Sequence, residues 1–341
     1  MSIPLIISVL VSFVTTYLLM PKFTEFLRLA GIVGTDVQKS SKPELAEMAG
    51  PVVLMGFLLG IFLFIWTRVF LYNESSSLIE MFAAVSTILI VTIIGMFDDL
   101  GRLIKTSHPK DAFGNIKRIG LKQWQKPLFV LPAAIPLMAV MAGDSSIILP
   151  FVGGVNVGIL FPLLFVPLGL VGASNATNML AGLNGLETGM GAVLLTSMGI
   201  YAYLNNEIAA AAIALIMTAA LLAFLKFNWY PAKVMPGDSL LYCIGATAAA
   251  VAVIGNMERF AIIAFFPWFI ELILKWRTHF KAEAFGVLQK DGTLAPPYGK
   301  SYSLTHFVMK HGRFKEKQIV SILVLVEVLF CLLAFGISGV L

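Results

Sequence analysis

Residues 80–97 read EMFAAVSTILIVTIIGMF, an apolar run that ends directly before Asp98 and Asp99. A run of about 20 apolar residues is long enough for a helix to cross the hydrocarbon core of a bilayer. The chain has 341 residues, of which 58% are hydrophobic and 13% are charged. Soluble globular proteins carry about 25% charged residues. The composition therefore excludes an ordinary soluble enzyme and indicates a membrane protein.

Ten such runs follow one another along the chain, and we interpret each as a transmembrane helix. This predicts an all-α polytopic membrane protein whose residues 1–341 form a single domain, a bundle of about ten transmembrane helices. The runs cover residues 2–20, 51–71, 80–97, 127–142, 158–173, 188–204, 208–225, 239–255, 260–274 and 319–339.

The positive charges fall almost entirely on one side of this predicted bundle. If the odd-numbered loops face the cytoplasm, all of the 24 Lys and Arg residues except Arg68 and Arg259 lie on that side. Cytoplasmic loops are enriched in Lys and Arg. We therefore expect both termini outside the cytoplasm and the active site on the cytoplasmic face, where residues 275–317 form a long loop. The net charge of +5 then reflects topology, and we expect no nucleic-acid partner.

Two acidic motifs stand where predicted helices meet the cytoplasmic surface. Asp98 and Asp99 end the third run, and Asp238 begins the eighth in VMPGDSLLYCIG. A solvated helix end would explain the pair, and an N-cap would explain Asp238. Alternatively, these carboxylates are held at the membrane surface, where they need a divalent cation or nearby Lys and Arg side chains.

The segment SNATNMLAGLNGLETGMG, residues 174–191, is polar without being basic. It links two predicted helices on the cytoplasmic side and contains no Lys or Arg. Its amides offer N–H donors and carbonyl oxygens, which can ligate a hard cation or read a base edge. A glycine-rich turn would need fewer asparagines. The candidate residues are Asn175, Asn178, Asn184 and Glu187.

Positive charge is concentrated before the fourth and the last predicted helices. Lys122 and Lys126 lie in GLKQWQKP, and the segment SLTHFVMKHGRFKEKQ precedes the last run. These side chains can donate charge-assisted hydrogen bonds to phosphate. A basic edge that attracts anionic lipid is the competing interpretation. The candidates for a phosphate clamp in the second segment are His306, Lys310, His311 and Arg313.

Carboxylates, amides and cations at one membrane boundary suit a metal-dependent transfer between a diphosphate in water and a phosphate on a lipid. The chain lacks the G-x-x-x-x-G-K-[ST] loop of P-loop ATPases. Charges within the predicted helices are sparse, whereas coupled transporters need charges near the bilayer midplane. A transporter and a non-catalytic lipid-binding scaffold are the alternatives from other functional classes.

At these residues the sequence resembles the polyprenyl-phosphate N-acetylhexosamine-1-phosphate transferases, which include dolichyl-phosphate GlcNAc-1-phosphotransferase. The resemblance extends over nearly the whole chain, from the ten-helix layout and the Asp98-Asp99 pair to NATNMLAGLNGLETG, PGD at 236–238 and HFVMKHGR. The asparagine-rich segment NATNMLAGLNGLETG is more similar to the archaeal and eukaryotic dolichol branch of the family than to the bacterial branches. The resemblance implies a multi-pass enzyme in the cell membrane of an archaeon, or in the ER membrane of a eukaryote, and leaves a homodimer open.

The activity that this resemblance implies is transfer of GlcNAc-1-phosphate from UDP-GlcNAc to a dolichyl or other polyprenyl phosphate in the lipid bilayer. UMP is released, Mg²⁺ or alternatively Mn²⁺ is the cofactor, and the step is the first lipid-linked one of protein N-glycosylation. Within the same family, another UDP-amino sugar or an undecaprenyl phosphate acceptor is the alternative.

The resemblance also implies roles for individual residues. Asn178 and Asp238 match metal-binding positions, and Asn184 matches a nucleotide-binding one. Asp98 and Asp99 match an acidic pair near the acceptor phosphate, in which one residue is a candidate base. Lys126 is the first choice for a lysine that contacts phosphate, and Lys122 is the second.

The resemblance also concerns the first inner loop and the basic loop. Glu47 and Lys39, the latter in a DxxK pattern with Asp36, match the nucleotide-sugar side of the first inner loop. The basic loop departs from the family pattern, so it stays open which of His306, Lys310, His311 and Arg313 contacts the diphosphate. We expect Asp98 and Asp99 mainly to position metal and acceptor, because a phosphate monoester with a second pKa near 6 is already largely dianionic at neutral pH.

Overall fold

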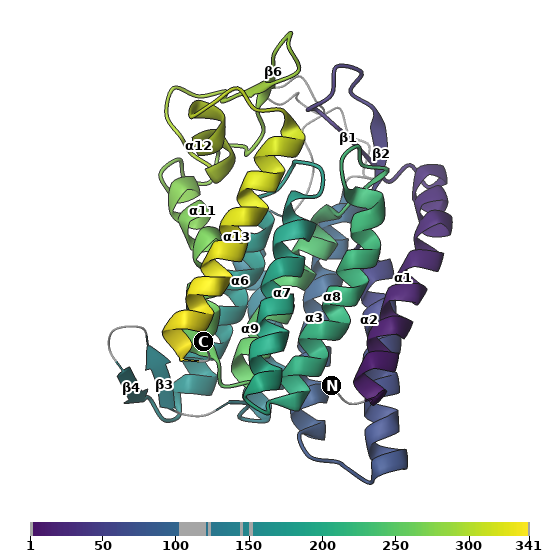
Figure 1. Cartoon of the computed structure of the whole chain (residues 1–341), viewed down its shortest axis with the longest axis vertical. Helices are drawn as coiled ribbons and strands as arrows, with labels where there is room; N and C mark the ends of the chain where they lie inside the picture. The colour runs from purple at the N-terminus through teal and green to yellow at the C-terminus, as the bar shows by residue number, and fades with distance from the viewer. Residues whose placement is uncertain (1–2, 102–120, 122–123, 144–145, 150–152, 340–341) are drawn as a thin grey trace.

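The computed structural model of the chain describes residues 3–101, 121, 124–143, 146–149 and 153–339, and its described part is a bundle of helices (Figure 1). Most of the chain is helical because long apolar segments without water must satisfy their backbone groups internally. The helices are α1 (Ile3–Leu29), α2 (Gly50–Trp66) with the π-helical η1 (Thr67–Leu71), α3 (Leu78–Leu100), α4 (Gln125–Val130), η3 (Leu131–Ala134), α5 (Ile135–Ala139), η4 (Phe161–Phe165), α6 (Val166–Met179), α7 (Leu186–Leu204), α8 (Ile208–Asn228), α9 (Gly237–Ile254), α10 (Glu258–Ala264), α11 (Phe266–Trp276), α12 (Leu304–Lys310) and α13 (Glu316–Ser338).

Six of the described helical segments are long and apolar enough to cross a membrane: α1, α2 with η1, α3, α8, α9 and α13. The chain is therefore a polytopic membrane protein, whereas ten spans remain a prediction. Each of the other predicted runs also falls on helical structure, but three of them are divided at prolines. Pro132, Pro162 and Pro267 stand at the starts of η3, η4 and α11. Proline lacks the backbone N–H that a continuous helix requires.

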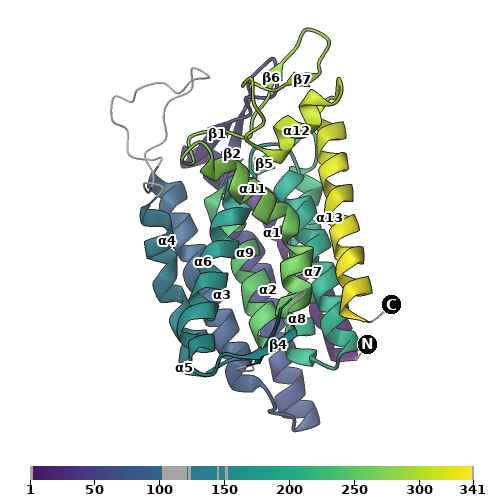
Figure 2. The ribbon, with the colours of Figure 1, turned by 90° about the vertical axis from the view of Figure 1, so that its left-hand side faces the viewer.

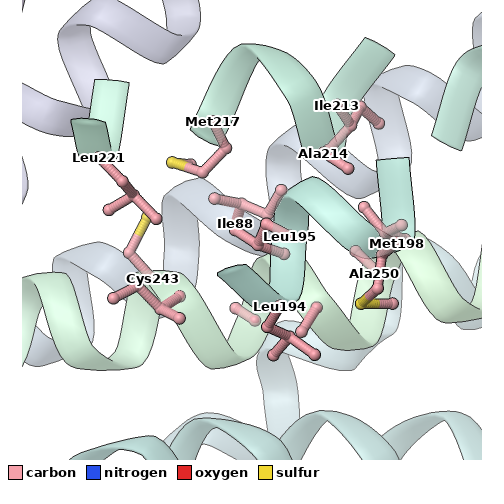
Figure 3. Close-up of a cluster of buried hydrophobic side chains, with 14 of the residues drawn as sticks. Ile88, Leu194, Leu195, Met198, Ile213, Ala214, Met217, Leu221, Cys243 and Ala250 are labelled. Atoms are coloured by element: carbon pink, nitrogen blue, oxygen red, sulfur yellow. The ribbon is translucent and has the colours of Figure 1, made fainter. Parts of the chain in front are cut away.

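The interior of the bundle is built from apolar side chains of α3, α7, α8 and α9. Figure 3 shows such a cluster, in which Ile88, Leu195, Met217 and Cys243 come from these four helices in turn. Small residues let the helices approach closely, as is typical of helix packing in membranes. A Cβ atom on Gly245 of α9 would lie 2.5 Å from the carbonyl oxygen of Ala173 on α6. Glycine at this position therefore permits the contact between α6 and α9.

Short strands join separate loops at one end of the bundle. The strands β1 (Val33–Thr35) and β2 (Glu44–Glu47) pair antiparallel, and β2 pairs parallel with β5 (Val234–Met235). In this register Glu47 lies opposite Met235, three residues before Asp238. The sheet thus fixes the loop after α1 beside the segment that leads into α9.

A second hairpin, β6 (Val287–Leu288) and β7 (Leu294–Ala295), lies with α12 at the same end of the bundle (Figures 1 and 2). The remaining pair, β3 (Ser146–Leu149) and β4 (Gly153–Asn156), lies toward the other end. The described beginning of α1 and the described end of α13 also lie away from β6 and β7. The polar loops that carry the predicted site residues therefore gather at the end opposite the termini.

Candidate active site

Asp99 joins the end of α3 to the beginning of α9. Its Oδ1 accepts a hydrogen bond from the backbone N–H of Asp238 at 2.7 Å, and its Oδ2 accepts one from Ser239 at 3.0 Å. The first N–H groups of a helix have no partner within it and favour negative charge. Asp99 is fully buried, so its carboxylate fixes the start of α9 and with it the position of Asp238.

Glycines permit this close approach of α3 and α9. A Cβ atom on Gly95, one turn before Asp99, would lie 2.7 Å from the carbonyl oxygen of Asp238 and from the Cα of Ser239. Gly237 has φ +71°, and a Cβ there would lie 2.6 Å from Asp99 Oδ2. Side chains at either position would separate the two carboxylates from the start of α9.

Asp98 points to a different partner, the ammonium group of Lys126. The Nζ of Lys126 lies 2.7 Å from Asp98 Oδ2 and 3.1 Å from Asp238 Oδ2. The backbone N–H of Leu121 donates to the other Asp98 oxygen at 2.6 Å. Lys126 stands in the first turn of α4, which packs beside α6 (Figure 2). One lysine thus links the ends of α3, α4 and α9.

Asn178 completes this group from α6. We orient the side-chain amide of Asn178 so that both its nitrogen and its oxygen have hydrogen-bond partners. Its Nδ2 then donates to Asp238 Oδ1 at 3.1 Å, and its Oδ1 accepts from Lys126 Nζ at 3.2 Å. The neighbouring Thr177 donates through its hydroxyl to the carbonyl oxygen of Leu241 at 2.8 Å, which holds α6 against α9. We name Asp98, Lys126, Asn178 and Asp238 the acidic cluster.

The oxygens of the acidic cluster fit a hard divalent cation. In the described part of the chain no three His, Cys, Asp or Glu side chains gather in a way that could hold a metal ion. Mg²⁺, however, is usually bound by one or two carboxylates together with water and substrate phosphates. The carboxylates of Asp98 and Asp238 and the amide oxygen of Asn178 could provide such a partial shell, in which substrate oxygens would be the other ligands.

A second polar group, the loop cluster, consists of Asp36, Lys39, Asn184 and Glu316. Lys39 pairs with Asp36 at 3.2 Å and also with Glu316. Asn184 donates through Nδ2 to Asp36 at 3.1 Å and through its backbone N–H to Glu316 at 2.8 Å. The ammonium of Lys39 lies 4.5 Å from the ring centroid of Tyr230. The loop cluster therefore connects the loop after α1, the loop before α7 and the start of α13.

Three further predicted residues are buried near these loops. Glu47 on β2 is 4% exposed, and Gly34 leaves space for its carboxylate on the adjacent strand. Glu187, in the first turn of α7, accepts a hydrogen bond from the backbone N–H of Gly182. Asn175 donates to the carbonyl oxygen of Val171 within α6 at 2.8 Å. Glu187 thus orders the loop before α7, whereas the side chain of Asn175 bonds to its own helix.

The basic segment divides into one buried residue and three exposed ones. His306 on α12 is fully buried between Phe285 and Tyr302, whose backbone groups lie 3.2 and 3.4 Å from its ring nitrogens. Burial lowers the pKa of His306 to about 4, so its imidazole is neutral at pH 7. Lys310, His311 and Arg313 are exposed. They supply the positive charge of this segment, while Lys122 lies outside the described residues.

Two residues in or beside these clusters, Tyr242 and Glu316, were not among the sequence candidates. Tyr242 is fully buried one turn after Asp238, and its ring centroid lies 5.9 Å from Lys126 Nζ. The spacing of four residues from Asp238 places it on the same face of α9 and could have indicated it. Glu316 is the only acidic residue in the basic segment RFKEKQ, and no other feature of the sequence points to it as a site residue.

Known proteins resemble this chain over most of its length. The model of glycosyl transferase family 4 matches residues 81–256, which include most of α3, the whole of α4, α6 and α9, and all of the acidic cluster. A protein of Saccharolobus solfataricus, provisionally named UDP-N-acetylglucosamine–dolichyl-phosphate N-acetylglucosaminephosphotransferase, is 34% identical over 97% of this chain and 95% of its own length. A protein of Sulfolobus acidocaldarius with the same provisional name has the same identity and coverage. The phospho-N-acetylmuramoyl-pentapeptide-transferase of Clostridium perfringens is 27% identical over 97% of this chain and 98% of its own length.

Proposed function

The chain belongs to glycosyl transferase family 4, and we propose that it transfers GlcNAc-1-phosphate from UDP-GlcNAc to a polyprenyl phosphate such as dolichyl phosphate, with release of UMP. The observation that carries this proposal is the acidic cluster, in which oxygens of Asp98, Asn178 and Asp238 converge on one point, now taken by the ammonium group of Lys126. The substrates are those named for the two archaeal relatives. Because these relatives are archaeal, the location that we propose for the protein is the cell membrane.

The reaction joins two anions, and this is its main difficulty. A phosphate oxygen of the acceptor attacks the β-phosphorus of the sugar nucleotide, the bond from that phosphorus to the bridging oxygen breaks, and UMP leaves with the bridging oxygen. The acceptor is already largely dianionic at neutral pH because the second pKa of a phosphate monoester is near 6. A strong base is therefore not required, and lowering the repulsion between the phosphates matters most.

The chain's own residues can lower this repulsion at the end of the bundle. Lys126 carries an ammonium group with three donors, and Lys310 and Arg313 add positive charge from the basic segment. Asp98, Asp238 and Asn178 would hold Mg²⁺, or Mn²⁺ in its place, which when bound neutralises charge on the diphosphate. Asp99 contributes indirectly, because it fixes the backbone that carries Asp238.

The loop cluster is our candidate for the nucleotide side of the site. Lys39 and Asn184 are brought together there, and the Oδ1 of Asn184 also accepts from the backbone N–H of Ala232 at 2.9 Å. Through β2 and β5, Glu47 lies in register with the segment before Asp238. A substrate that bridges from this loop to the acidic cluster would meet nucleotide contacts first and the metal at its phosphates.

We further propose that the polar end of the bundle faces the cytoplasm and that the bundle has ten spans with both termini outside. The support is the distribution of charge: Lys39, Lys310 and Arg313 lie at this end, and Arg68 pairs with Glu74 beyond η1 at the other end. Attachment of a membrane-impermeant reagent to single cysteines placed near Glu74 and near Lys310 tests the orientation.

The activity is tested by release of UMP from UDP-GlcNAc in the presence of a polyprenyl phosphate and Mg²⁺. We expect UMP in amounts that match the new lipid-linked GlcNAc diphosphate. UMP formation from UDP-GalNAc but not from UDP-GlcNAc would change the proposed sugar. Uptake of labelled UDP-GlcNAc into vesicles without formation of UMP would instead favour a transporter.

A further inference from the structure

Three oxygens of the acidic cluster surround a single nitrogen, the Nζ of Lys126. Asp98 Oδ2, Asp238 Oδ2 and Asn178 Oδ1 lie 2.7, 3.1 and 3.2 Å from it. They come from three different helices, α3, α9 and α6. An ammonium group has only N–H donors, so it occupies this shell as a compact cation would.

This position is enclosed. The side chain of Lys126 is 13% exposed, that of Asp98 is 3% exposed and that of Asp238 is 15% exposed. Two carboxylates that are taken out of water require a compensating positive charge. Within the cluster the ammonium group of Lys126 supplies positive charge to both carboxylates.

A divalent ion needs the same oxygens. Mg²⁺ binds oxygen ligands at about 2.0–2.1 Å, so an ion that uses the oxygens of Asp98, Asp238 and Asn178 would occupy the centre where the ammonium lies. Two cations cannot share that centre, because two positive charges so close together repel one another strongly in a site that is shielded from water. The oxygens can therefore hold the metal or the ammonium, but not both.

We infer that Lys126 is a built-in counter-ion that occupies the divalent-metal position and has to leave it when the metal binds. Asp98, Asp238 and Asn178 would then hold the metal in place of the Lys126 ammonium group. The released ammonium has three free donors beside the metal, where it can bind a phosphate oxygen of the substrate. Metal binding and phosphate binding are coupled in this way through one side chain.

This inference rests on the proposed metal site and predicts an effect that can be measured without substrate or turnover. Removal of the Lys126 charge should tighten metal binding, because the metal no longer competes with an ammonium group. We expect Lys126→Met to bind Mn²⁺ more tightly than the unchanged protein on the order of tenfold, within the usual range of coupling between two ligands. A lysine that only assists the metal from outside its shell predicts no change or weaker binding.

The experiment measures free Mn²⁺ by electron paramagnetic resonance during titration of the full-length protein in detergent. Lys275→Met is the matched control, since Lys275 is also buried but pairs with a single carboxylate, that of Glu271, 3.6 Å away and outside both clusters. It should leave the Mn²⁺ affinity unchanged, which separates competition at the acidic cluster from a general loss of positive charge. Lys126→Arg retains the charge and should not tighten binding.

The outcomes decide between the inference and the metal site on which it depends. Tighter Mn²⁺ binding by Lys126→Met than by Lys275→Met supports the inference, and so does binding that appears only in the Lys126 variant. If the unchanged protein binds Mn²⁺ and Lys126→Met binds no more tightly, the inference is wrong while the metal site stands. If neither protein binds Mn²⁺, both are wrong.

A second variant guards against misfolding. Should Lys126→Met not be recovered, Lys126→Gln, which keeps a donor for Asp98, carries the same expectation of tighter binding. Recovery of either variant only when Mn²⁺ is present during purification also supports the inference, because the metal then supplies the missing charge.

Discussion

Asp98 and Asp99 are neighbours in the chain, but their carboxylates have different partners. Asp99 accepts from the backbone N–H groups of Asp238 and Ser239, whereas Asp98 pairs with Lys126. A residue on a helix points about 100° away from the residue before it, so two adjacent side chains can serve two separate functions. The pair therefore divides into a residue that positions α9 and a residue that faces the cation.

Substitution of the two aspartates should separate stability from activity. Asp99→Ala leaves the backbone N–H groups of Asp238 and Ser239 without their carboxylate acceptor, and we expect a loss of about 3 kcal/mol in the free energy of unfolding. Asp98→Asn should lower the rate of UMP release more than it lowers the Tm. Thermal unfolding in detergent and the UMP assay measure both quantities. Equal Tm values for Asp99→Ala and the unchanged protein would contradict the positioning role.

The pH dependence of UMP release by Asp98→Asn tests whether Asp98 acts as a base. Because the acceptor phosphate is already dianionic above its second pKa near 6, we expect this variant to lose a constant factor in rate between about pH 6 and about pH 9. UMP release at a series of pH values provides the test. A displaced acidic limb in the variant would instead identify Asp98 as a base.

The close contact of α3 and α9 predicts a strong effect of one methyl group. Gly95→Ala would place a Cβ 2.7 Å from the backbone of Asp238 and Ser239, which forces the helices apart. Overpacking of this kind costs about 1–3 kcal/mol, and here it also moves Asp98 away from Asp238. We expect a lower Tm and reduced UMP release. Gly336→Ala on α13, where a Cβ would meet nothing within 4 Å, is the matched control and should leave both unchanged.

The loop cluster predicts that a change of one atom at Asn184 is destabilising. Asn184→Asp replaces the Nδ2 donor with an oxygen beside Asp36 Oδ2, which lies 3.1 Å from that donor now. The two carboxylates repel one another, so the Tm should fall. Addition of Asp36→Asn restores a donor and should recover part of the loss. A double variant no more stable than Asn184→Asp alone would show that this contact is not important.

The buried imidazole of His306 predicts a pH dependence of stability. The pKa of His306 in the folded protein is about 4, below the ordinary histidine value of about 6.5. Between these values the unfolded chain binds a proton that the folded chain does not, so stability is complete above about pH 6.5 and is lost as the pH falls toward 4. His306→Gln, which retains a donor and an acceptor, should flatten this decline in Tm, and substitution of the exposed His311 by Gln is the control. Identical pH profiles for His306→Gln and the unchanged protein would argue against a buried neutral histidine.

Much of the fold could be predicted from hydropathy, because residues that face lipid and residues that face the protein interior are both apolar. The runs at 80–97 and 208–225 became the continuous helices α3 and α8. The division of 127–142 into α4, η3 and α5 was not predicted, because the hydropathy of a residue says nothing about the backbone N–H group that proline lacks. The number of spans that cross the membrane therefore stays a prediction.

The candidate site was predicted in part. Asp98, Lys126, Asn178 and Asp238 are distant in the sequence but meet in the structure, as the expected gathering at one membrane boundary requires. Their roles remain predictions. The burial of His306 and the partnership of Glu316 with Lys39 depend on how the loop after α11 folds, which local sequence patterns do not specify.

The central claim is that Asp98, Asn178 and Asp238 bind one divalent ion that joins two phosphates. Its most direct test is the rate of UMP release from UDP-GlcNAc and polyprenyl phosphate as a function of Mg²⁺ concentration, in the unchanged protein and in Asp238→Asn. We predict that EDTA abolishes UMP release, that Mg²⁺ restores it, and that Asp238→Asn shifts the required Mg²⁺ concentration upward by about tenfold or more. UMP release that persists in EDTA, or an Asp238→Asn protein with the Mg²⁺ dependence of the unchanged protein, would contradict the claim.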